Sequence, residues 1–474
     1  MKPVQRELTQ LSAREIAAGI RSKKFSAREV TAATLARIER INPQLNALVD
    51  CDQDGARIAA DAVDRRVAAG DALPFAGVPI TIKDNLWVGG RRVAQGSKLF
   101  ENFIAPRDAW CVARLKMLGA IVVGITNCSE FACKLVTNNL LHGATRNPWN
   151  PNVATGGSSG GAASAVSARL GALALGTDAG GSVRRPAAHC GVVGMKPSTG
   201  LVPQLHGFGD PNFGVSVIGQ FAREVEDVAL MLEALVAFEP NDPWSVPLGG
   251  QMHMLRTVRR APPLSLRIAW SRRLGRNLLV DADVMSALVA MVDKLRAEGY
   301  TIEEDEPTWP DGMDLAPNLP LQQGGLAMLF GHDADTRPAL IDPDLLAQIK
   351  LGQQRSGVEI INAFALREQI QVRVAEFFQR YDLLLCPTAP VTAWSNDDPY
   401  PREIEGQSAE PRSHAAFTPL FNSAGVPACS VPVALVRGLP IGLQVVGPRH
   451  EDARVLQFSR LVEDLVDTRF DPPI

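Results

Sequence analysis

Two Gly/Ser clusters flank a run of small residues in the stretch 155–200, which reads TGGSSGGAASAVSARLGALALGTDAGGSVRRPAAHCGVVGMKPSTG. The first cluster is 156–161 and the second is 180–182. Glycine lets the backbone adopt positive φ and come close to a bound group. Serine offers a hydroxyl that becomes a nucleophile when another group removes its proton. A serine of this stretch can therefore act as a nucleophile only if another residue serves as the base that removes its proton.

Strands and helices alternate around this stretch. Residues 75–85 and 120–124 read as strands, and 108–118 and 160–169 read as helices, followed by a short strand at 172–175. The strands are apolar and rich in β-branched residues, which is typical of strands buried on both faces. The pattern predicts an α/β protein with a large mixed β-sheet covered by helices.

The rest of the chain continues the same organisation. Ser12-x-x-Glu15 and Ser26-x-x-Glu29 are capping boxes that predict two N-terminal helices. Further helices are predicted at 54–70, 220–237, 358–379 and 452–466, strands at 266–270 and 382–386, a hairpin at 431–446 and a loop at 390–413. Residues 307–345 fit no single pattern. Without an internal repeat, one domain over 1–474 is the expected division.

Composition excludes several classes of function. The 474 residues carry 48 basic and 51 acidic side chains, a net charge of −3, so nothing favours nucleic acid or an anionic membrane. The seven cysteines complete no zinc pattern and predict reduced, mostly buried thiols in a cytoplasmic protein. The N-terminus lacks the apolar core of a signal peptide, and no apolar run reaches the roughly 18 residues of a membrane span.

Lys83 stands at the end of an otherwise apolar strand. Burial of an ammonium is costly unless it is paired or loses its proton. One interpretation is a surface lysine that pairs with Asp84. The other is a desolvated lysine with a lowered pKa that acts as a base.

The first Gly/Ser cluster admits several interpretations. It could be a flexible linker, although it lies between a Pro/Asn turn and a helix. A phosphate loop fails because Ala162-Ala163 stand where Lys and Ser/Thr are needed. A nucleophile elbow fits Gly157–Gly161 with Ser159 as nucleophile, and it requires a histidine such as His414 or His450.

The second cluster is either a tight turn capped by serine or a catalytic loop. In the catalytic interpretation, the backbone N–H groups of Ala179, Gly180, Gly181 and Ser182 converge at a helix N-terminus and stabilise an oxyanion. Ser182 then lies beside them as the nucleophile.

Together these residues resemble the amidase signature family. The resemblance rests on Lys83 in PITIKDN, Ser158 in GGSSGGAASAVSA and Ser182 in GTDAGGSVRRPAAHCGVVGMKPS. Flanking agreement at 124–131, 147–151, 386–390, 422–427 and 442–447 extends it from about residue 10 to 466. It implies the amidase signature fold, with a signature core at about 65–215 and a more variable, pocket-forming part at about 240–415.

The resemblance implies a Ser–cis-Ser–Lys triad. Ser182 attacks the carbonyl, and Ser158, joined to Gly157 by a cis peptide bond, passes its proton to neutral Lys83. Ser159 supports Lys83 or the loop. The acyl-enzyme on Ser182 is hydrolysed through the same relay, with no metal or organic cofactor.

Substrate recognition is expected from variable positions. In some relatives the residue three after the nucleophile, here Arg185, binds a substrate carboxylate, and the alternative is a structural arginine. His189 and Cys190 are interpreted as structural. Phe131, Phe330 and Phe417 are candidates for an apolar pocket wall, with core packing as the alternative.

Four functions follow from this comparison. The main hypothesis is a stand-alone hydrolase of a small linear amide that releases ammonia or an amine. The alternatives are the glutaminase subunit of a tRNA-dependent amidotransferase, an esterase or carbamate (urethane) hydrolase, and an inactive binding protein. Arg185 argues against the glutaminase subunit, in which glutamine is usual at this position. The expected partner is a small-molecule amide, without nucleic acid or membrane, and a homodimer is the assembly considered.

Overall fold

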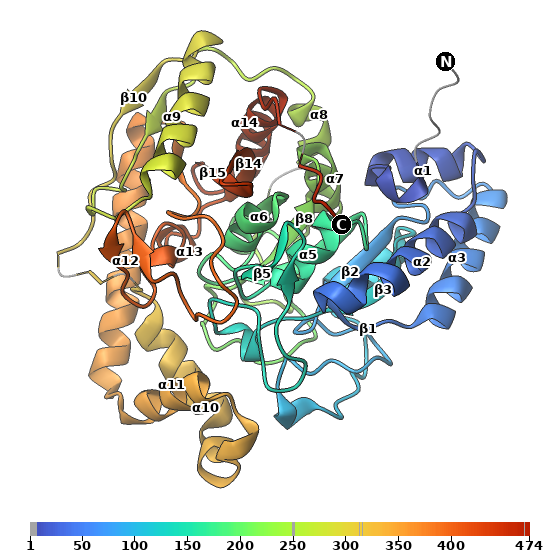
Figure 1. The fold of residues 1–474 in the computed structure, drawn as a ribbon, viewed down its shortest axis with the longest axis horizontal. Helices are drawn as coiled ribbons and strands as arrows, with labels where there is room; N and C mark the ends of the chain where they lie inside the picture. Colours follow the sequence, from blue (N-terminus) through green and yellow to red (C-terminus); the bar gives the residue numbers. More distant parts are fainter. Residues whose placement is uncertain (1–6, 249–251, 312, 315, 469) are drawn as a thin grey trace.

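A large mixed β-sheet forms the centre of the molecule (Figure 1). The computed structural model describes residues 7–248, 252–311, 313–314, 316–468 and 470–474. Within them the sheet has eleven strands, which are, in the order in which they lie side by side, β1 (Leu48–Asp50), β3 (Ile121–Thr126), β2 (Pro79–Lys83), β6 (Leu173–Asp178), β8 (Val217–Ala222), β7 (Val193–Lys196), β14 (Ala428–Val436), β15 (Leu439–Val446), β11 (Leu383–Pro387), β9 (Ile268–Trp270) and β10 (Ile302–Glu304).

Both parallel and antiparallel pairs occur in this sheet. Strand β2 pairs in parallel with β3 and β6, whereas β8 pairs antiparallel with both β6 and β7. The predicted mixed sheet is therefore confirmed. Because β2 and β6 are parallel neighbours, their carboxyl ends meet at one edge of the sheet. Lys83 ends β2 and Asp178 ends β6, so both lie at that edge.

Helices cover the sheet and the ends of its strands. They are α1 (Ala13–Arg21), α2 (Ala27–Leu45), α3 (Gln53–Ala68), α4 (Trp110–Met117), α5 (Gly160–Ser167), α6 (Arg184–Cys190), α7 (Val225–Leu235), α8 (Met254–Val258), α9 (Ala282–Ala297), α10 (Leu319–Thr336), α11 (Pro343–Gln354), α12 (Gly357–Arg380), α13 (Pro419–Ser423) and α14 (Asp452–Asp464). Two small hairpins stand apart from the sheet, β4 (Arg146–Asn147) with β5 (Asn150–Ala154) and β12 (Glu403–Ile404) with β13 (Gln407–Ser408).

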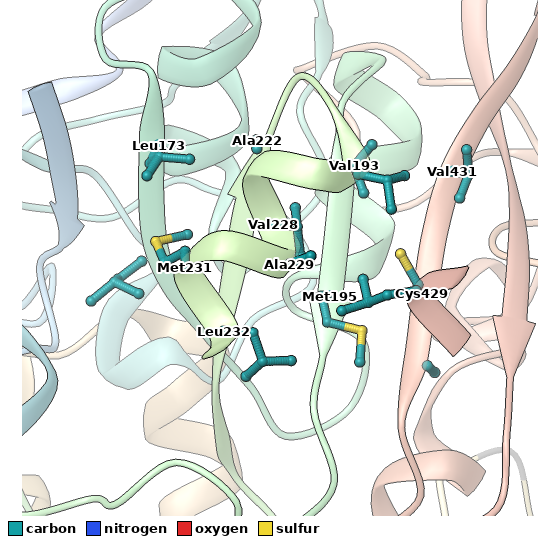
Figure 2. Close-up of a cluster of buried hydrophobic side chains, with 14 of the residues drawn as sticks. Leu173, Val193, Met195, Ala222, Val228, Ala229, Met231, Leu232, Cys429 and Val431 are labelled. Atoms are coloured by element: carbon teal, nitrogen blue, oxygen red, sulfur yellow. The ribbon is translucent and has the colours of Figure 1, made fainter. Parts of the chain in front are cut away.

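The side chains of β6 show that helices lie on both faces. Successive side chains of a strand point to opposite faces. Leu173 and Leu175 belong to the large hydrophobic cluster that also holds the side chains of α7, and Figure 2 draws Leu173 together with Met231 and Leu232 of that helix. Ala174, between them, belongs to a second cluster with residues of α5 and α6. Helix α7 therefore covers one face, and α5 and α6 cover the other.

The N-terminal helices begin as predicted. Ser12 and Ser26 each accept a hydrogen bond from the backbone N–H three residues later, and the glutamate there bonds back to the serine N–H. Both capping boxes are therefore present. The seven cysteines are all free, and every one except Cys51 is buried. Among the described residues, no helix is both long and apolar enough to cross a membrane.

Two predictions along the chain need correction, and one segment left unassigned proves to be helical. The helix predicted at 220–237 is preceded by β8, which runs to Ala222, so the helix begins only at Val225. When a short apolar run is buried on both faces, its hydrophobic residues show no periodicity by which a strand could be distinguished from a helix. The unassigned segment 307–345 contains α10 and the start of α11, and the predicted loop 390–413 contains the β12–β13 hairpin.

Candidate active site

Lys83 is buried at the carboxyl edge of the sheet, with no exposed surface. Its Nζ donates to Ser158 Oγ at 2.7 Å and to Thr177 Oγ1 at 2.9 Å. Asp84 does not pair with it, because the carboxylate of Asp84 accepts the backbone N–H groups of Ala94 and Gly96, each at 2.8 Å. The alternative of a surface lysine paired with Asp84 is therefore wrong.

Burial sets the protonation of this lysine. It lowers the pKa of Lys83 to about 8, because the ammonium has lost its water and no carboxylate of the described residues is in contact with it. Neutral lysine is thus accessible near pH 8, and its nitrogen can accept a proton from the hydroxyl to which it is bonded.

The serines of the first Gly/Ser cluster have separate surroundings. The peptide bond between Gly157 and Ser158 is cis, as the family resemblance implied. Ser159 Oγ donates to the carbonyl of Thr177 at 3.2 Å, and its N–H donates to the carbonyl of Ser182 at 3.2 Å. Ser159 therefore contacts the second Gly/Ser cluster and not Lys83.

Neither of the candidate histidines, His414 and His450, has a hydrogen bond to Ser159 in the described part of the chain. Both ring nitrogens of His414 are buried without a hydrogen-bond partner among the described residues, and its ring packs on Trp394 with a centroid distance of 4.6 Å. The backbone N–H of His450 donates to Ser198 Oγ. Burial and neighbouring cations hold the pKa of His414 well below its usual range, so this ring is neutral and belongs to the packing behind the site.

A buried ion pair holds the second Gly/Ser cluster. Burial alone would raise the pKa of Asp178, but the guanidinium of Arg184 and several hydrogen bonds outweigh it and hold the pKa far below its usual range. Arg184 Nη2 lies 2.9 Å from Asp178 Oδ1, with both side chains fully buried. Asn422 Nδ2 donates to the same carboxylate at 2.9 Å. No local pattern in the sequence marks these three residues as partners, so they were not among the predicted site residues.

Asp178 also reduces the number of backbone donors available to the expected oxyanion hole. Its carboxylate accepts the N–H of Gly181 at 2.7 Å and the N–H of Val183 at 3.0 Å. The N–H of Gly181 is therefore engaged within the protein, and its predicted role in the oxyanion hole is corrected. The remaining predicted donors are the N–H groups of Ala179, Gly180 and Ser182.

Two cavities meet at Ser182, a side chain that is 7% exposed. The first cavity has a volume of about 60 Å³ and is lined by Ala132, Cys133, Lys134, Leu135, Ala179, Gly180, Ser182, Arg185, Asn212, Ala316, Asn318, Leu319, Gln322, Arg412, Ala415 and Pro419. The second cavity has a volume of about 260 Å³, and its wall includes Phe131, Ser158, Thr177, Ser182 and Asp210. Ser158 and Ser182 thus face one common space.

Arg185 lines the first cavity with unused donors. Its Nη2 donates to the carbonyl of Gly157 at 3.0 Å, whereas its Nε and Nη1 have no partner among the described residues. Burial lowers the pKa of Arg185 to about 9, which still leaves the guanidinium charged at neutral pH. Arg412, which the sequence analysis did not single out, lines the same cavity.

The three candidate phenylalanines are placed differently. Phe131 lines the second cavity. Phe330 stacks behind it with a centroid distance of 3.9 Å and lines neither cavity at Ser182. Phe417 is fully buried in the main hydrophobic cluster. The expectation that Phe330 and Phe417 contact substrate directly is therefore corrected, because both serve packing.

A family model described as Amidase matches residues 29–456. Among curated proteins, the chain is 35% identical to the A subunit of glutamyl-tRNA(Gln) amidotransferase from Thermosynechococcus vestitus, over 93% of this chain and 95% of that protein. It is 33% identical to the protein of the same name from Pseudomonas aeruginosa, over 97% and 98% of the two chains.

Solved structures give a similar result. A 6-aminohexanoate cyclic dimer hydrolase superposes with a TM-score of 0.88 at 27% identity, covering 99% of both chains. A bacterial aryl acylamidase of the amidase signature family superposes with a TM-score of 0.88 at 27% identity, covering 96% of both chains.

Proposed function

The chain belongs to the amidase family, the amidase signature hydrolases that cleave C–N bonds, and on that premise we propose that it hydrolyses a small linear amide through an acyl-enzyme on Ser182. The observation that carries the proposal is the buried contact between Lys83 Nζ and Ser158 Oγ at 2.7 Å. Lys83, whose pKa is lowered to about 8, is hydrogen-bonded to the hydroxyl of Ser158. Ser158 in turn lines the same cavity as Ser182.

The reaction begins with proton transfer. Ser182 Oγ attacks the amide carbonyl carbon while its proton passes to Ser158 Oγ, and the Ser158 proton passes to Lys83 Nζ. The tetrahedral intermediate collapses, the C–N bond breaks, and the proton returns through Ser158 to the leaving nitrogen. Water then attacks the Ser182 ester by the same relay and releases the acid. Ammonia or an amine is the other product.

Backbone donors stabilise the tetrahedral oxyanion. With the N–H of Gly181 bonded to Asp178, the proposed donors are the N–H groups of Ala179, Gly180 and Ser182. Asp178 and Arg184 act indirectly, because they hold the loop in which these donors are fixed. In a serine protease, loss of one preorganised oxyanion donor raises the activation barrier by about 2.7–4 kcal/mol.

The two cavities separate the two halves of the substrate. Ser158, which returns the proton to the leaving nitrogen, lines the second cavity and not the first. The leaving group is therefore assigned to the second cavity, where Phe131 offers an apolar wall, and the acyl group to the first. Arg185 and Arg412 line the first cavity, and no aspartate or glutamate is among its described lining residues. An acyl group with a carboxylate or another polar acceptor suits this cavity.

The second candidate is the glutaminase subunit of a tRNA-dependent amidotransferase. The curated relatives favour it, because those at 33–35% identity are named as A subunits of glutamyl-tRNA(Gln) amidotransferases. The first cavity favours the stand-alone amidase, since glutamine would bring an α-ammonium group into a space lined by Arg185 and Arg412 and by no carboxylate of a described residue. Esters and carbamates remain substrates for the same serine chemistry.

One substrate panel separates these functions. Purified protein alone would be assayed on an anilide with a free carboxylate in its acyl part, the neutral anilide of equal length, glutamine, and the corresponding ester and carbamate. We expect turnover of the anilides, with a higher kcat/KM for the anionic one. Release of ammonia from glutamine with no turnover of either anilide would favour the glutaminase subunit. Ser182→Ala is the control for uncatalysed hydrolysis.

A further inference from the structure

A groove away from Ser182 runs along helix α12. It consists of two adjoining cavities, of about 240 and about 330 Å³, which share Gln371 and Arg449 as lining residues. On α12 the lining residues Arg367, Gln371, Ala375 and Phe378 follow one another at intervals of four, four and three, so they share one face of the helix. The opposite wall is formed by residues 424–426 and 448–449. We call this feature the α12 groove.

One end of the α12 groove is cationic. Arg367 and Arg449 both line it, and neither takes part in an ion pair with another described residue. Arg367 donates one hydrogen bond to the carbonyl of Phe213, and its guanidinium lies 6.0 Å from the ring centroid of Trp244. After burial, Arg449 is the strongest influence that lowers the pKa of Arg367, and Asp210 is the acid that opposes it. Two arginines thus repel one another across a cavity.

The same end contains an unused hydroxyl. Thr199 is 6% exposed, lines the cavity, and its Oγ1 has no hydrogen-bond partner among the described residues. A buried hydroxyl without a partner costs free energy, and a bound acceptor would remove that cost. The two arginines and the hydroxyl therefore offer hydrogen-bond donors to one cavity. No carboxylate is among the described residues that line it.

The other end of the α12 groove is apolar. Apart from the shared Gln371 and Arg449, its wall consists of Ala375, Phe378, Ala424, Val426 and Pro448. A hydrocarbon chain placed there would remove apolar surface from water on both sides. The groove is thus amphipathic along its length, with a charged end and a hydrocarbon end.

We propose that the α12 groove is a second binding site for a monocarboxylate with an unbranched apolar chain. The carboxylate lies between Arg367 and Arg449 and accepts the hydroxyl of Thr199. The chain lies along Ala375 and Phe378. Charge-assisted bonds to arginine supply the specificity for an anion, and the apolar end favours a long-chain anion over a short hydrophilic one such as acetate.

Octanoate is the probe, titrated into the full chain by calorimetry. We expect binding of octanoate, with acetate and 1-octanol at least about tenfold weaker because each lacks one of the two contacts. Arg449→Ala should weaken octanoate binding about tenfold or more, whereas Arg437→Ala, on the exposed surface, should leave it unchanged. Ala375→Asp should weaken it, and Ala365→Asp, exposed on the same helix but outside the groove, should not.

Two results would overturn the proposal. The first is equal octanoate affinity in the parent, Arg449→Ala and Ala375→Asp chains. The second is binding that Arg185→Met abolishes and Arg449→Ala leaves intact, which would assign octanoate to the cavity at Ser182. Arg449 is exposed and forms no hydrogen bond or ion pair with another described residue, so its alanine variant should melt at the parent temperature. Equal melting curves verify that a weaker affinity does not come from unfolding.

Discussion

Thr177 is expected to control the proton affinity of Lys83. Its Oγ1 accepts a hydrogen bond from Lys83 Nζ at 2.9 Å and another from Asn85 Nδ2 at 3.0 Å. An acceptor stabilises the ammonium form of lysine more than the neutral form. Thr177→Val keeps the shape of the side chain and removes the acceptor, so the pKa of Lys83 should fall below its value of about 8.

The size of the shift follows from the bond that is lost. A hydrogen bond to a charged group contributes about 1.5–3 kcal/mol, and one pKa unit corresponds to about 1.4 kcal/mol. Because Ser158 Oγ still accepts from Nζ at 2.7 Å, we expect the lower limit, about one unit. Neutral lysine is the active form, so kcat/KM rises with pH through this pKa and is level above it. The acidic limb should move from about pH 8 to about pH 7 in the variant, with a lower plateau because the base is weaker.

The measurement is kcat/KM on one anilide from pH 5 to pH 10 for the parent, Thr177→Val and Thr177→Ser. The serine variant retains the acceptor and should keep the parental limb. An unchanged limb in Thr177→Val would refute the assignment of this limb to Lys83. A rate optimum near pH 5 in the parent would refute the lysine base altogether.

Further substitutions probe the remaining parts of the site. Ser182→Ala and Lys83→Ala should each lower kcat by at least about 10³-fold with an unchanged circular dichroism spectrum, and full activity in either variant would exclude the relay. His414→Ala should change kcat by less than about tenfold, since that ring contacts Trp394 and not the serines; a loss as large as that of Lys83→Ala would restore the nucleophile-elbow hypothesis. Asp178→Asn should lower the free energy of unfolding by about 3–5 kcal/mol, because it leaves a buried guanidinium without its carboxylate. Urea denaturation measures this change, and Arg272→Ala, which breaks an exposed pair, should cost no more than about 1 kcal/mol.

Local patterns predicted much of the fold. The capping boxes at Ser12 and Ser26 and the long helix α12 lie where their residues indicated, because both signals depend on neighbours within one helical turn. The strand β8 was missed because Val217–Ala222 is buried throughout, and its pairing with β6 and β7 is a contact between distant segments. Segment 307–345 was unassigned because its glycine and proline content conceals the helix α10.

The sequence by itself determined which side chains could do chemistry. Lys83 at the end of an apolar strand and serines in two glycine-rich clusters are local facts that mark these side chains as candidates, and the family resemblance implied which is the base and which the nucleophile. The tertiary structure alone decided how these groups are used. It buries Lys83 against Ser158 and Thr177, directs the N–H of Gly181 to Asp178, and packs Phe417 into the core. The reason is physical: burial and long-range partners set a pKa and the use of a donor, and both depend on segments that meet only when the sheet has formed.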